Sequence, residues 1–276
     1  MSFLMLTLVL ISCEEQQLNH ASARNITTEA QQIGDICYNC VHDENRRYES
    51  SSRNQTSCRF FQQFRSQGVP ERPLRQALMF YENNRSQFQN QRYISIADYS
   101  QNSTQKRFYI LDLQTGNVRR EKVSHGSGMR NGVARGDSSH NGMLDRCHHG
   151  NNINDRTNMT RAGFFQTQNF YQSTNNLAGW PPIDRSGSNG LRMRGLSPGV
   201  NEEALDVGVV MHGAYYNDLG PRMGRSYGCP AFESSVASSV LSTIRGGSLY
   251  YSYTPQCQEL QSIVERQVQG WERMCG

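Results

Sequence analysis

The sequence has no large excess of charge of either sign. Its 276 residues include 28 basic and 24 acidic side chains, which gives a net charge of +4. Nucleic-acid-binding domains normally concentrate a much larger basic excess on one surface, so we expect no nucleic-acid partner. Hydrophobic residues make up only 36% of the chain, which is low for a soluble globular protein and predicts long polar loops.

No apolar run is long enough to cross a membrane as a helix, which needs about 20 residues. The run at residues 3–11 has instead the length of a signal-peptide core, although no Lys or Arg precedes it. Its end, Leu10-Ile11-Ser12-Cys13, resembles a bacterial lipobox, in which Cys13 carries the lipid. We therefore expect residues 1–12 to be a signal peptide and the protein to be a lipid-anchored protein of the bacterial periplasm or cell envelope. Plain secretion and a cytoplasmic location are the alternatives.

A phosphate-binding glycine loop is also missing. Gly126, Gly128 and Gly132 follow a predicted strand, but their spacing is GxGxxxG and Asn131 occupies a position where a dinucleotide fingerprint has glycine. No helical pattern comes after them. This segment therefore gives no support for a nucleotide cofactor, and no internal repeat is apparent.

The spacing at which apolar residues recur changes along the chain. Residues 13–36 are polar and aperiodic, as in a tether, and residues 37–91 read as a small Cys-bearing helical module. From residue 92 to residue 254 the period is mostly two, which predicts a mainly β domain. Strands are expected at 93–97, 108–113, 118–124, 163–167, 191–194, 207–211 and 248–253, and helices at 72–81 and 236–244.

The most informative stretch is Val209–Phe232. A predicted buried strand ends at His212 and Gly213, and sixteen residues separate His212 from Cys229. A cysteine attacks a carbonyl as its thiolate, so it needs a nearby base or positive field, and His212 can supply the base. Pro230 suits the first position of a helical turn, which would place the thiol at the positive end of that turn. The competing interpretation is a structural cysteine and a core histidine.

This stretch resembles the murein L,D-transpeptidase catalytic-domain family, whose motif is His-Gly, a spacer and Ser-(His or aromatic)-Gly-Cys. His212 matches the catalytic histidine and Cys229 the nucleophile, while Ser226 and Gly228 match the residues before it. Tyr227 stands where the commonest motif has His, as in a subfamily with Pro-Ala after the cysteine. The resemblance extends back to Tyr93–Gly128.

The resemblance implies a mixed, barrel-like β-sandwich with a few helices, no cofactor and no metal. It also implies acyl transfer at a peptidoglycan stem peptide. Cys229 would attack the carbonyl of the third residue and expel the terminal D-residue, with His212 as base and then acid. The Gly213 carbonyl would orient the imidazole, and backbone N–H groups at Gly228 and Cys229 would hold the oxyanion.

The substrate-carboxylate anchor is less clear. Arg225 and Arg222 are the candidates for it, with a surface charge as the alternative for each. His125 is expected to face the substrate, with an ordinary loop histidine as the alternative. Relatives usually carry an Arg shortly after the cysteine, where this chain has Ala231 and Phe232. Two other functions remain open: an L,D-carboxypeptidase, in which water resolves the same acyl-enzyme, and a non-catalytic wall-binding lipoprotein. The oligomeric state is open as well.

Six cysteines remain once Cys13 and Cys229 are set aside. They are Cys37, Cys40, Cys58, Cys147, Cys257 and Cys275. An even number in an exported chain favours disulfides over zinc, because the paired CxxC spacing of a zinc site is absent.

The C-terminus constrains the pairing of these cysteines. Apolar residues at helical spacing predict one amphipathic helix over Gln256–Arg273, within a C-terminal segment of residues 255–276. A straight helix would hold Cys257 and Cys275 about 27 Å apart, whereas a disulfide needs Cα atoms within about 7 Å. We therefore predict a bond between Cys147 and Cys257, and one from Cys275 to Cys37, Cys40 or Cys58. A break at Gly270 would weaken this reasoning.

Overall fold

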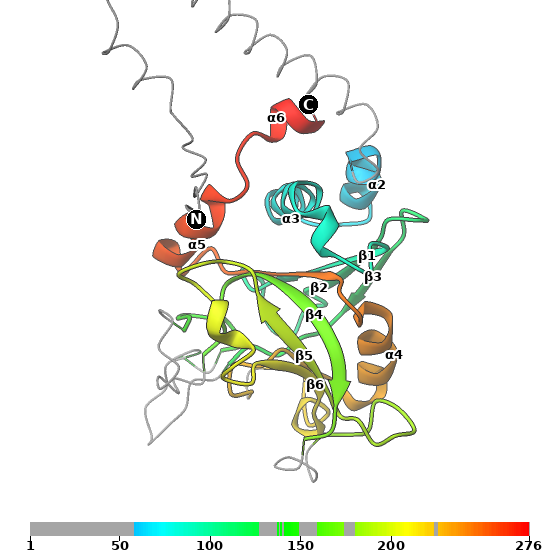
Figure 1. Ribbon diagram of the computed structural model, residues 1–276. Coiled ribbons are helices and arrows are strands. Elements are labelled where there is room, and N and C mark those ends of the chain that lie inside the picture. Colours follow the sequence, from blue (N-terminus) through cyan, green and yellow to red (C-terminus); the bar gives the residue numbers. More distant parts are fainter. Residues whose placement is uncertain are drawn as a thin grey trace, which may run out of the picture. The chain divides into compact units, whose positions relative to one another are not determined.

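The computed structural model describes residues 58–126, 137, 139, 141–148, 159–173, 180–223 and 226–275, all within the unit 52–276. These residues form one eight-stranded sheet in the order β3-β2-β1-β8-β4-β5-β6-β7 (Figure 1). The strands are β1 Tyr93–Asp98, β2 Phe108–Asp112, β3 Val118–Glu121, β4 Gly163–Tyr171, β5 Gly190–Gly195, β6 Val210–Gly213, β7 Ala231–Phe232 and β8 Leu249–Tyr253. The β1–β8 and β6–β7 pairs are parallel and the other pairs are antiparallel. Each predicted strand overlaps an observed one, although β3 ends at Glu121 and β6 begins only at Val210; β7 was not predicted.

The two ends of the strand order approach each other, which gives the sheet its nearly closed, barrel-like form. Just beyond β3, the backbone N–H of Ser124 donates to the carbonyl of Ala231 in β7 at 2.8 Å. Next to this bond, the ammonium group of Lys122 lies 3.1 Å from the carboxylate of Glu233. The expected mainly β, barrel-like architecture with a few helices is confirmed.

Helices cover the sheet because both of its faces are apolar. The longer helices are α2 Phe61–Ser66, α3 Glu71–Asn83, α4 Ser234–Ile244, α5 Gln258–Arg266 and α6 Trp271–Cys275. Short 3-10 turns lie at Cys58–Phe60, Arg85–Gln87, Glu202–Ala204 and Tyr215–Asn217. Figure 1 shows α2, α3, α5 and α6 on one side of the sheet and α4 on another.

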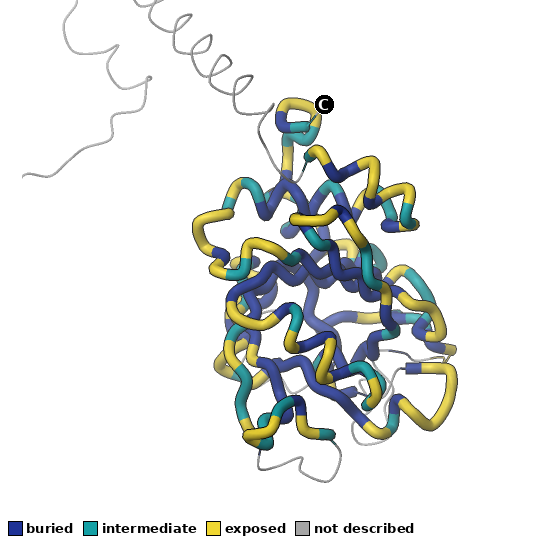
Figure 2. The backbone as a smooth tube through the Cα atoms, turned by 90° about the vertical axis from the view of Figure 1, so that its right-hand side faces the viewer, coloured by how far each residue is buried: buried dark blue, intermediate teal, exposed yellow. Residues whose placement is uncertain are grey.

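Alternation along the central strands divides the core between two faces. Phe164 of β4 stacks on Tyr251 of β8 and on Phe80 of α3, with ring centroids 4.3 and 3.9 Å apart. On the opposite face, Phe165 packs on Tyr250. The buried backbone at the centre of Figure 2 follows these strands. Because α3 packs directly on this sheet, part of the expected 37–91 module shares its core with residues 92–254.

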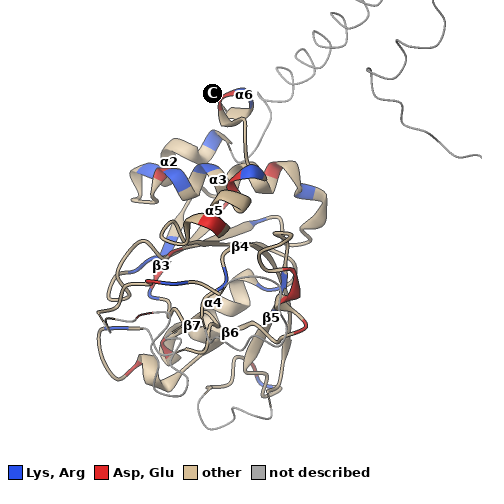
Figure 3. Ribbon diagram, turned by 90° about the vertical axis from the view of Figure 1, so that its left-hand side faces the viewer, with Lys and Arg blue, Asp and Glu red and all other residues tan. Residues whose placement is uncertain are grey.

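The outer faces of the helices are polar, as expected for elements with one side in water. Basic and acidic residues are interspersed on α2, α3 and α5 (Figure 3). Among them are ion pairs between Arg75 and Glu71 at 2.6 Å and between Arg72 and Glu265 at 2.6 Å. Within the described ranges, no helix is both long and apolar enough to cross a bilayer.

The single C-terminal helix predicted over Gln256–Arg273 is wrong. The structure has two helices, α5 and α6, because the chain turns after Arg266 and Gly270 adopts a left-handed φ of 95°. Disulfides nevertheless join Cys147 to Cys257 and Cys58 to Cys275, so the predicted pairing is confirmed. The break redirects the tail towards α2, where Cys58 lies just before the helix.

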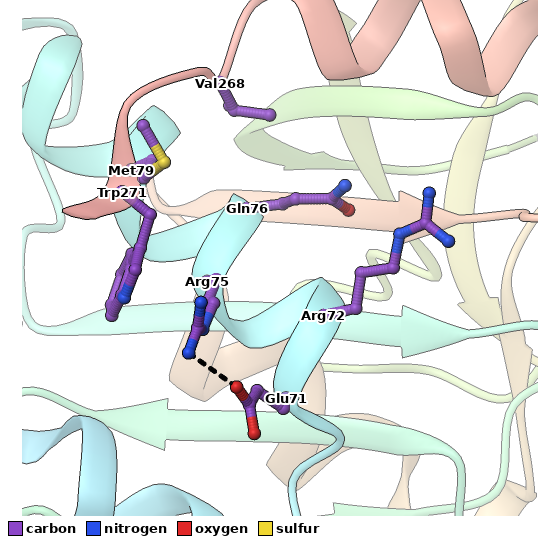
Figure 4. Close-up of a pocket in the computed structure, with 7 residues that line it drawn as sticks. All are labelled: Glu71, Arg72, Arg75, Gln76, Met79, Val268 and Trp271. Atoms are coloured by element: carbon purple, nitrogen blue, oxygen red, sulfur yellow. Dashed lines mark ion pairs between the residues drawn. The ribbon is translucent and has the colours of Figure 1, made fainter. Parts of the chain in front are cut away.

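A groove of about 400 Å³ lies between α3 and the C-terminal segment. Trp271 and Met79 stand at one end of this groove and Arg72 at the other (Figure 4). Both arginines of the groove are engaged by carboxylates, Arg72 by Glu265 and Arg75 by Glu71. The groove therefore presents no excess of positive charge.

Candidate active site

Strands β6 and β7 bring the two residues of the motif together. His212 lies in β6, and its backbone N–H donates to the carbonyl of Pro230 at 3.3 Å. The parallel register places His212 opposite Ala231, so Cys229 lies just before β7, level with Val210. The backbone of Val210 hydrogen-bonds the Cys229 sulfur. Sixteen intervening residues thus close a loop that returns the chain beside the same strand.

His212 is held in one tautomer. Its Nδ1 lies 2.8 Å from the carbonyl oxygen of Gly213, and because a carbonyl can only accept, Nδ1 must carry the proton. Nε2 is then the basic nitrogen. The side chain is only 2% exposed, and burial lowers the pKa of His212 to about 4, so the imidazole is neutral at pH 7.

An aromatic side chain covers the imidazole. The ring of Trp180, from the segment between β4 and β5, stacks on His212 with centroids 3.7 Å apart and planes inclined by 16°. The neighbouring Pro181 packs against Gly213 so closely that a Cβ on this glycine would lie 2.8 Å from the proline ring. Only glycine permits this approach, which brings Trp180 over the histidine.

Cys229 is the only cysteine in the described ranges that lies outside a disulfide. Burial raises the pKa of its thiol, and the hydrogen bond from Val210 and the charge of Arg161 only partly oppose this effect. The thiol and the imidazole are therefore both neutral in the resting site. Gly228, immediately before it, has a φ of 97°, a conformation that glycine adopts without strain.

The predicted helical turn at Pro230 is wrong. Pro230 leads directly into β7, so no helix begins at Cys229 and no helix dipole acts on the thiol. The raised thiol pKa agrees with this arrangement. A proline just before a short edge strand lacks no N–H that the strand needs, so the sequence did not distinguish a helix start from a strand start here.

The residues before Cys229 are fixed by the segment after β3. Ser226 pairs with Gly126 in an isolated parallel bridge, and its hydroxyl donates to the carbonyl of His125 at 3.0 Å. His125 is fully buried; its Nδ1 accepts a 2.7 Å hydrogen bond from Arg107, and its Nε2 lies 3.5 Å from Asp137. This histidine supports the loop and presents no surface to a ligand in this structure.

The structure says little about the remaining predicted site residues. Tyr227, two residues before Cys229, is 73% exposed, and Arg222 lies at the surface. Arg225 and Cys13 lie outside the described residues. Contacts of these residues with substrate stay predictions.

Sequence reasoning missed a buried polar cluster beside the site. The Nε of Arg161 donates to Glu203 at 2.7 Å, and its Nη2 lies 3.4 Å from Nε2 of His148. Glu203 and His148 are buried, and Arg161 is 9% exposed. These residues come from three segments distant in sequence, so no local pattern pointed to them. Trp180, one of only two tryptophans and followed by Pro-Pro, was the clearer signal.

A family model described as the L,D-transpeptidase catalytic domain matches residues 65–253, more than half of the chain. Similar solved structures include an L,D-transpeptidase from Mycobacterium smegmatis, with 14% identity and a TM-score of 0.34 over 59% of each chain. L,D-transpeptidase 3 from Mycobacterium tuberculosis has 12% identity and a TM-score of 0.33, over 59% of this chain and 61% of that one.

A third similar structure is the helical cell shape determining protein Pgp2 from Campylobacter jejuni. It has 13% identity and a TM-score of 0.34, and the match covers 62% of this chain and 52% of that one. The chain therefore spans less than two thirds of the length of each of these structures. No curated protein matches it.

Proposed function

Because the chain belongs to the L,D-transpeptidase catalytic domain family, we propose that it is a cysteine L,D-transpeptidase of peptidoglycan. The observation that carries the proposal is the fixed tautomer of His212, whose strand β6 runs beside the segment that holds Cys229. With Nδ1–H donated to Gly213, the Nε2 lone pair remains available for the thiol proton. A structural cysteine would have no need of an oriented base.

The resting pair is neutral, so proton transfer accompanies attack. The sulfur of Cys229 attacks the carbonyl carbon of the third stem-peptide residue while Nε2 of His212 takes the thiol proton. Backbone N–H groups at Gly228 and Cys229 hold the oxyanion. His212 then returns the proton to the leaving amine of the terminal D-residue, and a thioester on Cys229 remains.

The second half of the reaction reverses these roles. An acceptor amine attacks the thioester, His212 takes its proton, and the thiol of Cys229 is released as the new amide bond forms. If water replaced the amine, the same site would act as an L,D-carboxypeptidase. The two outcomes differ only in the product.

We further propose that the protein acts in the cell envelope, anchored through a lipid on Cys13. The two disulfides support this location, because disulfides persist in oxidising compartments. Mass spectrometry of the protein from its host membrane tests the anchor. A lipid on Cys13 is expected; an unmodified Cys13, or a protein that still carries residues 1–12, contradicts it.

Intact-protein mass spectrometry tests the activity. The purified protein, incubated with a disaccharide-tetrapeptide, is expected to gain the acyl mass on Cys229, and a carbapenem is expected to give a stable adduct there. Cys229→Ala should form neither adduct. Product analysis with and without an acceptor amine then separates transfer from hydrolysis. If folded wild-type protein forms no adduct with either compound, the non-catalytic alternative is favoured.

A further inference from the structure

Arg161 is a nearly enclosed cation, and its contacts with the described residues use two of its three guanidinium nitrogens. Its Nε is bonded to Glu203 and its Nη2 lies near His148, whereas Nη1 donates no hydrogen bond within the described ranges. The Arg161 side chain is 9% exposed, so the guanidinium is not fully enclosed. Glu203 itself has a buried oxygen, Oε2, without a hydrogen bond among the described residues. The pair thus keeps both a donor and an acceptor unfilled.

Two chains of contacts place this pair beside the nucleophile. Thr160, the neighbour of Arg161, accepts a 2.8 Å hydrogen bond from Gly126, which is bridged to Ser226 of the Cys229 loop. On the other side, Ala204, the neighbour of Glu203, accepts a 2.8 Å hydrogen bond from Val209. Val209 directly precedes the residue whose backbone hydrogen-bonds the Cys229 sulfur.

The electrostatics agree with this placement. The charge of Arg161 acts on the Cys229 thiol in the direction opposite to burial, which requires the guanidinium to be near the sulfur. Ala231 and Phe232 follow the cysteine and are fully buried and apolar, so they supply no cation there. Arg161 is therefore the described cation whose charge acts on the nucleophile.

We propose that Arg161 binds the free C-terminal carboxylate of the donor peptide, with Glu203 and His148 holding its guanidinium in place. The inference rests on the proposed function, in which Cys229 attacks the peptide bond before the terminal residue. That carboxylate lies only one residue beyond the attacked carbon, so its anchor must be close to the sulfur. A charge-assisted hydrogen bond from Nη1 in a poorly solvated site provides strong selection for an acid over an amide.

Alkylation of Cys229 tests the carboxylate site without any peptide substrate. Iodoacetate and iodoacetamide both transfer a carbon to the sulfur with loss of iodide, but only iodoacetate carries a carboxylate. In the full-length protein, peptide mass spectrometry gives the ratio of the two rates at Cys229, normalised to the same ratio for a free thiol. Arg161→Gln should lower the ratio about tenfold, the effect of one hydrogen bond to a charged group.

Arg194→Gln is the matched control, because Arg194 is an exposed residue of β5 opposite Gln166 of β4 and does not pair with Glu203. It should leave the ratio within about twofold. Arg161→Gln leaves the buried Glu203 carboxylate without its cation, which can destabilise the fold. The double variant Arg161→Gln/Glu203→Gln removes both charges and avoids this cost. An unchanged ratio in either folded Arg161 variant overturns the proposal and leaves Arg161 as a structural ion pair.

The donor itself provides the second arm. Wild-type protein should acylate with the tetrapeptide about tenfold or more faster, in kcat/KM, than with its C-terminal carboxamide, and Arg161→Gln should lose this preference. If neither donor acylates Cys229, the proposed function fails, while the alkylation ratio still tests Arg161. If both donors acylate equally in the wild type, the carboxylate anchor fails alone.

Discussion

At the scale of single residues, burial decides the chemistry of His212 and Cys229. Burial lowers the pKa of the imidazole to about 4 and raises that of the thiol, so neither group is charged at neutral pH. A thiolate–imidazolium pair would need the opposite shifts. In the proposed reaction, the thiol proton is therefore transferred during attack and no thiolate forms beforehand.

This neutral pair predicts a distinctive pH profile for acylation. His212 must be unprotonated to accept the thiol proton, so the rate should be flat between about pH 5 and 8 and fall as the pH drops through about 4. Stopped-flow acylation by a carbapenem across this range measures it. An acidic limb near 6.5, the ordinary histidine value, would contradict the assignment. His212→Ala should acylate about a hundredfold or more slowly at every pH.

Trp180 contributes to the low pKa of His212 by covering its ring. Trp180→Ala should admit water to the imidazole and shift the acidic limb of the acylation profile upwards, towards 6.5. The other tryptophan, Trp271, lies in α6 and packs on Phe61, so Trp271→Ala is the control and should leave the limb in place. An equal shift in both variants would point to a general loss of packing.

The same burial links stability to pH. The unfolded chain protonates His212 near pH 6.5 and the folded protein only near 4, so the unfolded state binds more protons between these values. The free energy of unfolding should therefore fall as the pH drops from 6.5 to 4, by up to about 3 kcal/mol from this residue. Urea unfolding of wild type and His212→Gln at pH 7 and pH 4.5 measures it. An identical loss in both proteins would assign the effect to other groups.

At the scale of elements, Gly213 joins β6 to its neighbours. A Cβ there would lie 2.7 Å from Ala237 of α4 and 2.8 Å from Pro181, so one of them must move. Gly213→Ala should lower the free energy of unfolding by about 1–3 kcal/mol, the usual cost of overpacking. It should also slow acylation, because a displacement of Pro181 would move Trp180, the residue before it. Thermal unfolding and carbapenem acylation report the two effects. Gly220→Ala is the control, since nothing lies within 4 Å of its Cβ position, and it should behave as wild type.

Elements with a clear local period were predictable. The alternation of β1 and the apolar spacing of α3 gave both elements within a few residues, and the His212–Cys229 spacing located the site. The straight C-terminal helix failed because apolar spacing continues across Gly270, whose left-handed backbone ends the register. Pro230 failed because a proline fits a helix start and an edge strand equally well.

The rest of the site depends on contacts between distant segments, and single-sequence patterns carry no information about these. Trp180 meets His212 across a loop, and Arg161 meets Glu203 across β4 and β5. Their residue types are ordinary for loops and for surface charge. The pairing of the neighbouring strands β4, β5 and β6 brings these residues together.

At the scale of the whole molecule, two nested disulfides close the chain. The Cys58–Cys275 bond spans 217 residues and encloses the Cys147–Cys257 bond, which spans 110. Loop-closure entropy gives about 5 kcal/mol for each, as an upper figure that depends on the entropic model. Cys58→Ala/Cys275→Ala should therefore lower the melting temperature strongly. At temperatures below that melting temperature, its rate of carbapenem acylation should stay within about threefold of the wild-type rate. A loss of acylation in the folded variant would connect the C-terminal tail to the site.

The Cys58–Cys275 bond also has a topological consequence. Its two Cα atoms are 5.5 Å apart, so the bond closes residues 58–275 into a covalent ring. When the two ends of a folded segment lie this close, they can be joined and the chain opened at another point without changing how the strands pack. A circular permutant of residues 58–275 would have a short linker between residues 275 and 58 and new termini at the exposed turn between Gln114 and Thr115. Each strand of its sheet should keep the same neighbours as in the original chain.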